Sequence, residues 1–279
     1  MVNSTQSPIV STEWVEQHKN DADIQVVEVD VDTSAYDSGH IEGAIAWNWT
    51  TQLNDQIRRD ILDRGQMEQL LGQSGISPDT TIVLYGDNNN WFAAYAYWQL
   101  KLYGHEKLDL MDGGRVKWEK ENRNYTNDIP EVTPTKYEAK SADPSMRALQ
   151  PDVMEAVKNA QPLVDVRSPQ EYSGEVIAPE GMNETAQRGG HIPHAVNVPW
   201  KEVVNEDGTF KSPEELESLY SKKGITSDKP VVTYCRIGER SAHTWFVLHE
   251  LLNFNKVRNY DGSWTEWGSM VGVPIDKAN

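Results

Sequence analysis

The sequence predicts two α/β domains of the same kind in tandem, each a parallel sheet flanked by helices. Three observations predict this fold class: an internal repeat, alternating strand-like and helix-like segments in each half, and a proline-containing segment between the halves. At a constant offset of 149 positions, residues 81–118 and 230–267 contain eight identical pairs. Because strands alternate with helices in each copy, we expect each half to form its own parallel sheet.

The repeated segment shows the same succession of elements in both copies. The apolar runs 82–85 and 231–234 are short and continuous, which predicts buried strands. A polar loop follows each run, and then an amphipathic helix, which spans about residues 241–252 in the second copy. The identical pairs are Val83/Val232, Tyr85/Tyr234, Ala93/Ala242, Leu102/Leu251, Lys107/Lys256, Asp112/Asp261, Gly113/Gly262 and Trp118/Trp267.

Two landmarks extend the repeat toward the start of each half. Residues 29–32 correspond to residues 164–167, and Gly39-His40-Ile41 corresponds to Gly190-His191-Ile192. Because these histidines recur in both copies, we expect them to support a turn and not to take part in catalysis.

The domain boundary is predicted from the prolines between the two copies. Segment 127–147 contains three prolines and reads as an extended linker between domains 1–126 and 148–279. In the second domain, Ser168-Pro169-Gln170-Glu171 predicts a helix start, with a capping-box pair and proline at the first helical position. Only the second copy carries a 16-residue insertion, roughly residues 174–189, which we expect to border the functional site.

Charge and composition exclude several classes of function. The chain has 43 acidic and 26 basic residues, a formal net charge of -17, so a nucleic-acid partner is not expected. No segment has the roughly 18 consecutive apolar residues of a membrane helix, and no secretion signal is evident, so we expect a cytoplasmic protein without a membrane partner. The single cysteine allows neither an intramolecular disulfide nor a structural zinc site.

The cysteine occupies a position that favours nucleophilic chemistry. The loop Cys235-Arg236-Ile237-Gly238-Glu239-Arg240-Ser241 follows a predicted strand and leads into a helix. Ligands of open α/β sheets bind beyond the carboxyl ends of the strands, where this loop lies. A helix N-terminus, nearby arginines and a nest of backbone N–H groups would lower the pKa of a thiol. We therefore expect a reactive thiolate, in contrast to the small buried core residue that most free cysteines are. The matching loop of the first half begins Gly86-Asp87-Asn88-Asn89-Asn90 and has neither cysteine nor arginine.

Together these features resemble the rhodanese family, specifically its two-domain thiosulfate sulfurtransferases. The resemblance covers nearly the whole chain and rests on the repeated landmarks, the Cys235–Ser241 loop and Asp261-Gly262-Ser263-x-x-Glu266-Trp267. It implies two tandem rhodanese-like domains, of which the first is catalytically silent. It also implies that no metal or organic cofactor is needed, and that the partners are a small-molecule donor, thiosulfate, and an acceptor, cyanide or a thiol.

The resemblance assigns roles to the residues of the loop. Cys235 takes the outer sulfur of the donor as a persulfide, and three arginines bind the substrate. Arg188 is included because it precedes Gly190-His191-Ile192, where many members place an anion-binding arginine. The substrate-binding residues are Arg188, Arg236 and Arg240, and the backbone of Ile237, Gly238, Glu239 and Ser241 cradles the persulfide.

One departure from the family pattern keeps alternatives open. Ile237 stands where several members carry a lysine that holds thiosulfate, so anion recognition would rest on the arginines. The alternatives are a mercaptopyruvate sulfurtransferase, a cysteine-dependent phosphatase of the same fold and a non-catalytic sulfur-relay module. Four residues separate Cys235 from Arg240, whereas the phosphatases need five, so the smaller loop favours sulfur.

Overall fold

The computed structural model describes residues 7–179, 181 and 185–277. The chain divides between Asp143 and Pro144 into two compact units, and Asn205–Phe210 belong to the first unit. This division falls inside the segment 127–147 that the prolines mark as a linker. Of that segment, residues 127–143 form no helix or strand, and a 3-10 turn, η2 (Pro144–Met146), follows them.

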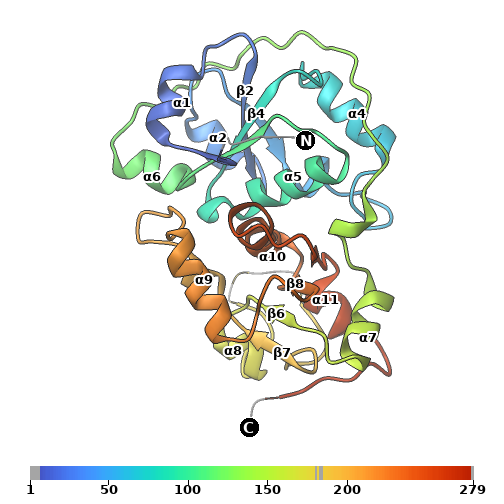
Figure 1. Ribbon diagram of the computed structural model, residues 1–279. Helices are drawn as coiled ribbons and strands as arrows, with labels where there is room; N and C mark the ends of the chain where they lie inside the picture. The colour runs from blue at the N-terminus through green and yellow to red at the C-terminus, as the bar shows by residue number, and fades with distance from the viewer. Residues whose placement is uncertain (1–6, 180, 182–184, 278–279) are drawn as a thin grey trace. The chain divides into compact units, whose positions relative to one another are not determined.

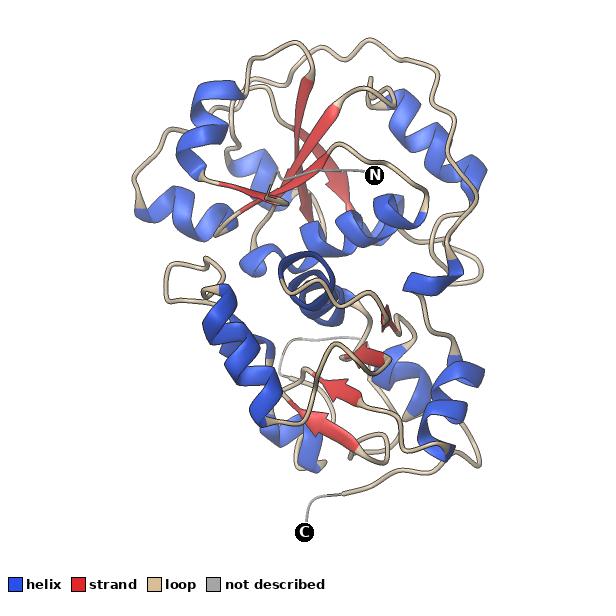
Figure 2. Cartoon of the chain, viewed as in Figure 1, coloured by secondary structure: helices blue, strands red, loops and turns tan. Residues whose placement is uncertain are grey.

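The first unit contains a five-stranded parallel sheet (Figures 1 and 2). Its strands, in spatial order, are β1 (Ile9–Val10), β5 (Leu108–Met111), β4 (Thr81–Tyr85), β2 (Ile24–Asp30) and β3 (Ile45–Asn48). The central strands are buried over most of their length, as expected for a parallel sheet covered on both faces. The apolar run at residues 82–85 therefore does form a buried strand.

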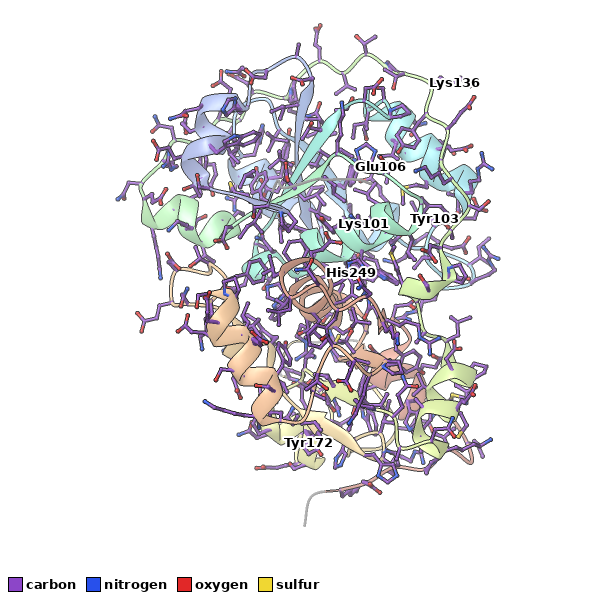
Figure 3. The ribbon with its side chains drawn as sticks, viewed as in Figure 1. Lys101, Tyr103, Glu106, Lys136, Tyr172 and His249 are labelled. Atoms are coloured by element: carbon purple, nitrogen blue, oxygen red, sulfur yellow. The ribbon has the colours of Figure 1, made fainter. Side chains whose placement is uncertain are left out.

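Helices cover both faces of the first sheet. One face packs against α1 (Thr12–His18), α2 (Ser34–Ser38) and α6 (Gly114–Lys120), which share a core cluster with the strands (Figure 1). The other face packs against α5 (Trp91–Leu102), which contacts β2, β4 and β5. The short α3 (Trp49–Gln52) follows β3, α4 (Arg64–Gln73) precedes β4, and η1 (Asn88–Asn90) precedes α5. Side chains fill the space between sheet and helices (Figure 3).

The second unit repeats this plan with four parallel strands. Their order is β7 (Ala195–Asn197), β6 (Leu163–Asp165), β8 (Val231–Tyr234) and β9 (Val257–Asn259), which corresponds to β3, β2, β4 and β5 of the first unit. The helices α7 (Gln150–Lys158) and α11 (Ser263–Trp267) share a core cluster on one face. On the other face α10 (Glu239–Phe246) packs on β8 and β9. The unit also contains α8 (Pro169–Ser173), η3 (Trp200–Val203) and α9 (Pro213–Lys222).

Two predictions about helix ends have different outcomes. The helix start at Ser168 is confirmed, because its side chain accepts a hydrogen bond from the N–H of Glu171 and the Glu171 side chain accepts one in return. The helix expected to begin near Ser241 instead begins at Glu239, because Gly238 takes a positive φ of 108° and ends the loop there. After Phe246 the helix continues as a π-helical turn over Val247–Leu251.

The repeated histidines do support turns, as expected. His40 and His191 each place Nδ1 2.9 Å from a tyrosine carbonyl, of Tyr36 and Tyr172 respectively, and stack on that tyrosine's ring. Among the described residues, no helix is long and apolar enough to cross a membrane.

Candidate active site

Cys235 lies at the carboxyl end of the central strand β8, where the chain turns into α10. The residue is fully buried. The Gly238 N–H donates a hydrogen bond to Sγ over 3.1 Å, and the thiol donates to Oε2 of Glu239 over 3.3 Å. The sulfur is thus in contact with the Gly238 N–H and the Glu239 carboxylate at the N-terminus of a helix.

Two carbonyl groups of the cysteine loop accept hydrogen bonds from α11. The N–H of Trp264 donates to the Cys235 carbonyl over 3.1 Å, and the N–H of Thr265 donates to the Arg236 carbonyl over 3.0 Å. The Cys235 N–H donates to Oγ of Ser263 over 3.0 Å, and Ser263 adopts a positive φ of 53°. Because α11 takes these carbonyls, the loop can present an N–H group to the sulfur, as an anion-binding nest requires.

The pKa of Cys235 departs from the expectation. We expected the loop to lower it, but the pKa is raised above its ordinary value. Burial is the largest cause, and the Glu239 carboxylate adds to it, while Arg240, Ser241 and the Gly238 N–H act in the opposite direction. The arginines and the helix N-terminus were visible in the sequence, but the complete burial of the sulfur was not.

Arg240 is held by a carboxylate from another helix. Its Nη1 and Nη2 donate to Oε2 and Oε1 of Glu171, each over 3.0 Å, and its Nε lies 3.5 Å from Oε1 of Glu239. Arg240 and Glu171 are 3% and 1% exposed, so the pair is desolvated and bidentate. Burial alone would raise the pKa of Glu171, but the hydrogen bonds and charge of Arg240 lower it overall.

Arg188 is engaged by the end of α11. Its guanidinium donates to four carbonyls: those of Trp267 and Gly268 over 3.1 Å each, of Met270 over 2.8 Å and of Val273 over 3.2 Å. A guanidinium has five N–H donors, so this clamp uses most of its capacity. Of the insertion that contains it, residues 180 and 182–184 lie outside the described residues.

The other predicted loop residues are gathered around the cysteine. Arg236 and Ile237 are both buried, at 4% exposure each. Ser241 is fully buried, and its Oγ lies 2.7 Å from Oδ1 of Asn259 on β9. The structure therefore brings Arg236, Ile237, Gly238, Glu239, Arg240 and Ser241 together around Cys235, whereas Arg188 is occupied at the end of α11.

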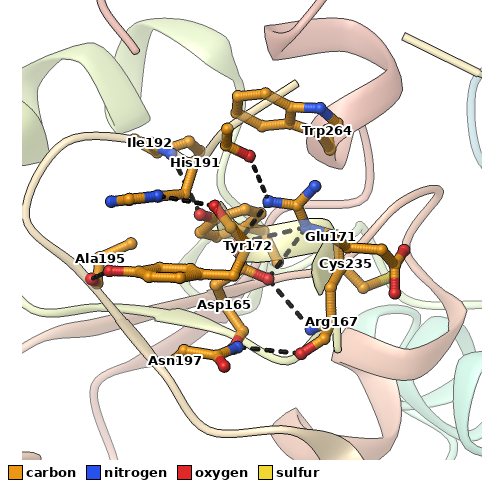
Figure 4. A network of polar contacts seen from close by, with 12 residues as sticks. Asp165, Arg167, Glu171, Tyr172, His191, Ile192, Ala195, Asn197, Cys235 and Trp264 are labelled. Atoms are coloured by element: carbon orange, nitrogen blue, oxygen red, sulfur yellow. Dashed lines mark hydrogen bonds and ion pairs between the residues drawn. The ribbon is translucent and has the colours of Figure 1, made fainter. Parts of the chain in front are cut away.

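A buried ion pair at the end of the neighbouring strand supports this arrangement. Nε and Nη2 of Arg167 donate to the carboxylate of Asp165, over 3.0 and 2.6 Å, and Nη2 also donates to the Gly190 carbonyl over 2.8 Å. The guanidinium carbon lies 4.6 Å from the ring centroid of Trp264, so Arg167 is enclosed by β6, the Gly190 turn and α11 (Figure 4). Since α11 also holds the loop carbonyls, this pair fixes the helix that positions the cysteine loop.

Sequence reasoning missed the side-chain contacts of Glu171 and Ser263, and the contact of Glu239 with the sulfur. Glu171 was predicted only as a helix cap, and Glu239 was predicted to contribute its backbone to the cradle or its carboxylate to Arg240. Ser263 belongs to the Asp261–Trp267 motif, which contributed to the family resemblance but predicted no contact for this side chain. Within residues 7–179, 181 and 185–277, no group of three or more His, Cys, Asp or Glu residues could hold a metal ion.

Comparison with known proteins places both halves in one family. The model of the rhodanese-like domain matches residues 11–121 and again residues 150–270. A relative from Haloferax volcanii, named "Putative thiosulfate sulfurtransferase", is 55% identical over 276 residues, which cover 97% of this chain and 96% of the relative. The sulfur carrier protein TtuD of Thermus thermophilus is 52% identical over 274 residues, with 96% of each chain covered.

Solved structures agree with this assignment. The 3-mercaptopyruvate sulfotransferase SseA of Escherichia coli is 25% identical with a TM-score of 0.75, over 93% of this chain and 99% of SseA. The anaerobic ergothioneine biosynthesis enzyme of Chlorobium limicola, also 25% identical, has a TM-score of 0.83 over 98% of this chain and 70% of that enzyme. With a rhodanese-like domain in each half, the chain belongs to the rhodanese family of sulfurtransferases.

Proposed function

We propose that the protein is a thiosulfate sulfurtransferase that carries the outer sulfur of thiosulfate on Cys235. The cysteine attacks that sulfur, sulfite leaves, and the resulting persulfide passes its sulfur to cyanide or to a thiol. The first unit, whose corresponding loop has no cysteine, acts as a silent partner domain.

The observation that carries this proposal is the Gly238 N–H at 3.1 Å from Sγ of a buried cysteine at a strand end. A persulfide extends the side chain by one sulfur atom that bears negative charge. A donor N–H at a helix N-terminus stabilises such a charge, because both the hydrogen bond and the helix dipole favour an anion there. The relatives named for thiosulfate support the choice of donor.

The arginines receive different parts in this proposal. Arg236 and Arg240 supply positive charge to the loop, and Arg240 does so while bound to Glu171. The resemblance places Arg188 among the substrate ligands. In the structure it binds the end of α11, the helix whose N–H groups bind the loop carbonyls. We therefore propose that it positions the loop and does not bind the donor.

Mass spectrometry and donor kinetics test the proposal together. Incubation with thiosulfate is expected to add one sulfur, about 32 Da, to Cys235 and to release one sulfite per chain. Rates with thiosulfate should exceed those with 3-mercaptopyruvate at equal concentration. If the Cys235→Ser variant still transfers sulfur, or if no persulfide forms, the proposed function is wrong.

A second function is favoured by one relative. TtuD of Thermus thermophilus is named a sulfur carrier protein, and it is 52% identical to this chain over nearly its full length. A carrier would use the same Cys235 persulfide but deliver it to a protein thiol. Loading Cys235 and then offering cyanide, a small thiol or a protein thiol would separate the two functions by the acceptor that unloads it fastest.

A further inference from the structure

Glu239 contacts the sulfur atom that the proposed function loads, and sulfur transfer as described so far leaves its side chain without a part. Its Oε2 atom lies 3.3 Å from Sγ, with the thiol as the donor. Glu239 is 1% exposed and Cys235 is fully buried, so neither group exchanges a proton with solvent directly in this conformation. The carboxylate is the acceptor already in place for the thiol proton.

We propose that Glu239 takes the proton of Cys235 as sulfur is loaded and holds it until the sulfur has been passed on. This inference rests on the proposed function and adds a catalytic residue to it. Its physical reason is charge. A persulfide anion beside an ionised carboxylate would place two negative charges in a buried site, and that arrangement is costly. Moving the proton to the carboxylate leaves one negative charge, on the sulfur, next to the Gly238 N–H.

The step balances without any further reactant. In loading, the S–H bond of Cys235 breaks and its proton goes to Glu239. The thiolate forms a bond to the outer sulfur of thiosulfate, and the sulfur–sulfur bond of thiosulfate breaks, with its electron pair leaving on sulfite. In unloading to cyanide, the persulfide bond breaks, thiocyanate leaves, and the Cys235 thiolate recovers the proton from Glu239. Charge is conserved in both halves, and the enzyme returns to its starting state.

The charged groups around the pair allow this exchange. On the same helix, Arg240 lies with Nε 3.5 Å from Oε1 of Glu239 while it binds Glu171 of α8. Arg236 belongs to the loop itself, and Ser263 of α11 places Oγ 4.0 Å from Sγ. Two ion pairs lie at neighbouring strand ends: Asp165 with Arg167 after β6, and Asp261, just before α11, with Arg147. Cys235 and Glu239 thus form one coupled pair that shares a proton.

The rate of sulfur loading tests the role of the carboxylate. Glu239→Gln keeps the shape of the side chain but removes its ability to take a proton. At a pH where the Cys235 thiol of this variant is protonated, as its thiolate absorbance shows, single-turnover loading should slow by ~10²–10⁴-fold, the usual contribution of a general base. The deficit should shrink as the pH rises toward the thiol pKa of the variant. Glu239→Asp should retain part of the rate.

A matched control separates this role from helix electrostatics. Glu214 is an exposed glutamate in the first turn of α9, so Glu214→Gln removes the same charge from the same kind of helix position. This variant should load at the rate of the parent protein. Melting temperatures of all variants identify any loss of fold.

Proton counting gives a second readout that a structural role would not change. In a weakly buffered solution with thiosulfate and an indicator dye, the parent protein itself should release no proton on loading. The only protons exchanged should be those that the released sulfite takes up. Glu239→Gln should release one more per persulfide formed, at a pH where its thiol is protonated. The proposal is overturned if the two proteins release equal numbers, or if Glu239→Gln loads as fast as the parent. Persulfide formation in the parent keeps the proposed function intact in either case.

Discussion

The two units share a framework but differ in the loop that follows the central strand. In both, the tyrosine that ends this strand, Tyr85 or Tyr234, accepts the N–H of the isoleucine of the Gly-His-Ile turn over 3.1 Å. A buried guanidinium donates to the glycine carbonyl of that turn in both, from Arg115 over 2.9 Å or Arg167 over 2.8 Å. The two arginines come from different elements, α6 in one unit and the end of β6 in the other. The same contact with the turn is therefore made by arginines from positions that do not correspond in the repeat.

The first unit has no room for a side chain at the position that corresponds to Cys235. Gly86 corresponds to Cys235, and a Cβ atom built there would lie 2.3 Å from the Val29 carbonyl oxygen and 2.6 Å from Oδ1 of Asp30. Both distances are too short for any side chain, so the strand end has no room for a thiol. The loop is held instead by Asn90, whose Oδ1 accepts the Gly86 N–H over 3.0 Å. The first unit therefore lacks both the cysteine and the room that its side chain would need.

The largest expected effect comes from moving the cysteine between units. Cys235→Ser should abolish persulfide formation, and adding Gly86→Cys should not restore it. The added side chain should also lower the free energy of unfolding by ~1–3 kcal/mol, the usual cost of overpacking. Mass spectrometry after thiosulfate and urea unfolding measure the two effects. A persulfide on residue 86 would show that the first unit can form the same site.

The shared guanidinium is tested by removing it from each unit. Arg167→Met leaves the buried Asp165 without its cation, and Arg115→Met does the same to Glu28, whose Oε1 lies 2.7 Å from Nη1 of Arg115. Each change should lower the free energy of unfolding by ~3–5 kcal/mol, because an unpaired charge remains buried.

The double variant Asp165→Asn/Arg167→Met serves as the control for that experiment. It removes both charges and should recover much of the loss. A clear loss from only one of the two single arginine variants would mean that the frameworks are not equivalent.

The Arg240→Lys variant tests whether Arg240 stabilises the structure around the loop or binds the substrate. Lysine keeps the charge but loses the bidentate fit to Glu171, so stability should fall by ~1.5–3 kcal/mol, on the order of one charge-assisted hydrogen bond. Because the guanidinium is already bound, the Michaelis constant for thiosulfate should change less than the melting temperature. A large rise in that constant with normal stability would instead make Arg240 a ligand of the donor.

Counted per pH unit, the smallest effect is expected at Asp30, which lacks the cation that Asp165 has. Burial and the carboxylates of Asp87 and Glu28 raise the pKa of Asp30 to about 10, whereas the unfolded chain ionises near ~3.9. Between these values the folded protein retains a proton that the unfolded chain has lost. The free energy of unfolding therefore falls as the pH rises through that range.

Asp30→Asn removes this loss and keeps the oxygen that accepts the Asp87 N–H. Its stability relative to the parent should increase with pH, by at most ~1.4 kcal/mol per pH unit. Urea unfolding of both proteins at about pH 5, 7 and 9 measures the trend. A difference that stays constant with pH would mean that Asp30 is ionised in the folded protein.

The sequence by itself determined the tandem fold and the position of Cys235 at the end of a strand. Apolar runs and their spacing are local properties, so the strands at 82–85 and 231–234 and the helix start at Ser168 could be predicted from neighbouring residues. The position of Cys235 after a buried strand followed from the same pattern. The first residue of α10 was misplaced, because only the positive φ of Gly238 decides where the loop ends.

The partners of the charged side chains were decided only by the tertiary structure. Arg240 meets Glu171 across 69 positions of sequence, and Arg188 meets the end of α11 across about 80. No local pattern contains such pairings, because they form when two elements pack and exclude water. The same exclusion of water raises the pKa of Cys235 where the composition of its loop predicted a lower one. Sequence identified the groups at the site, while burial decided which of their charges are paired, and with what.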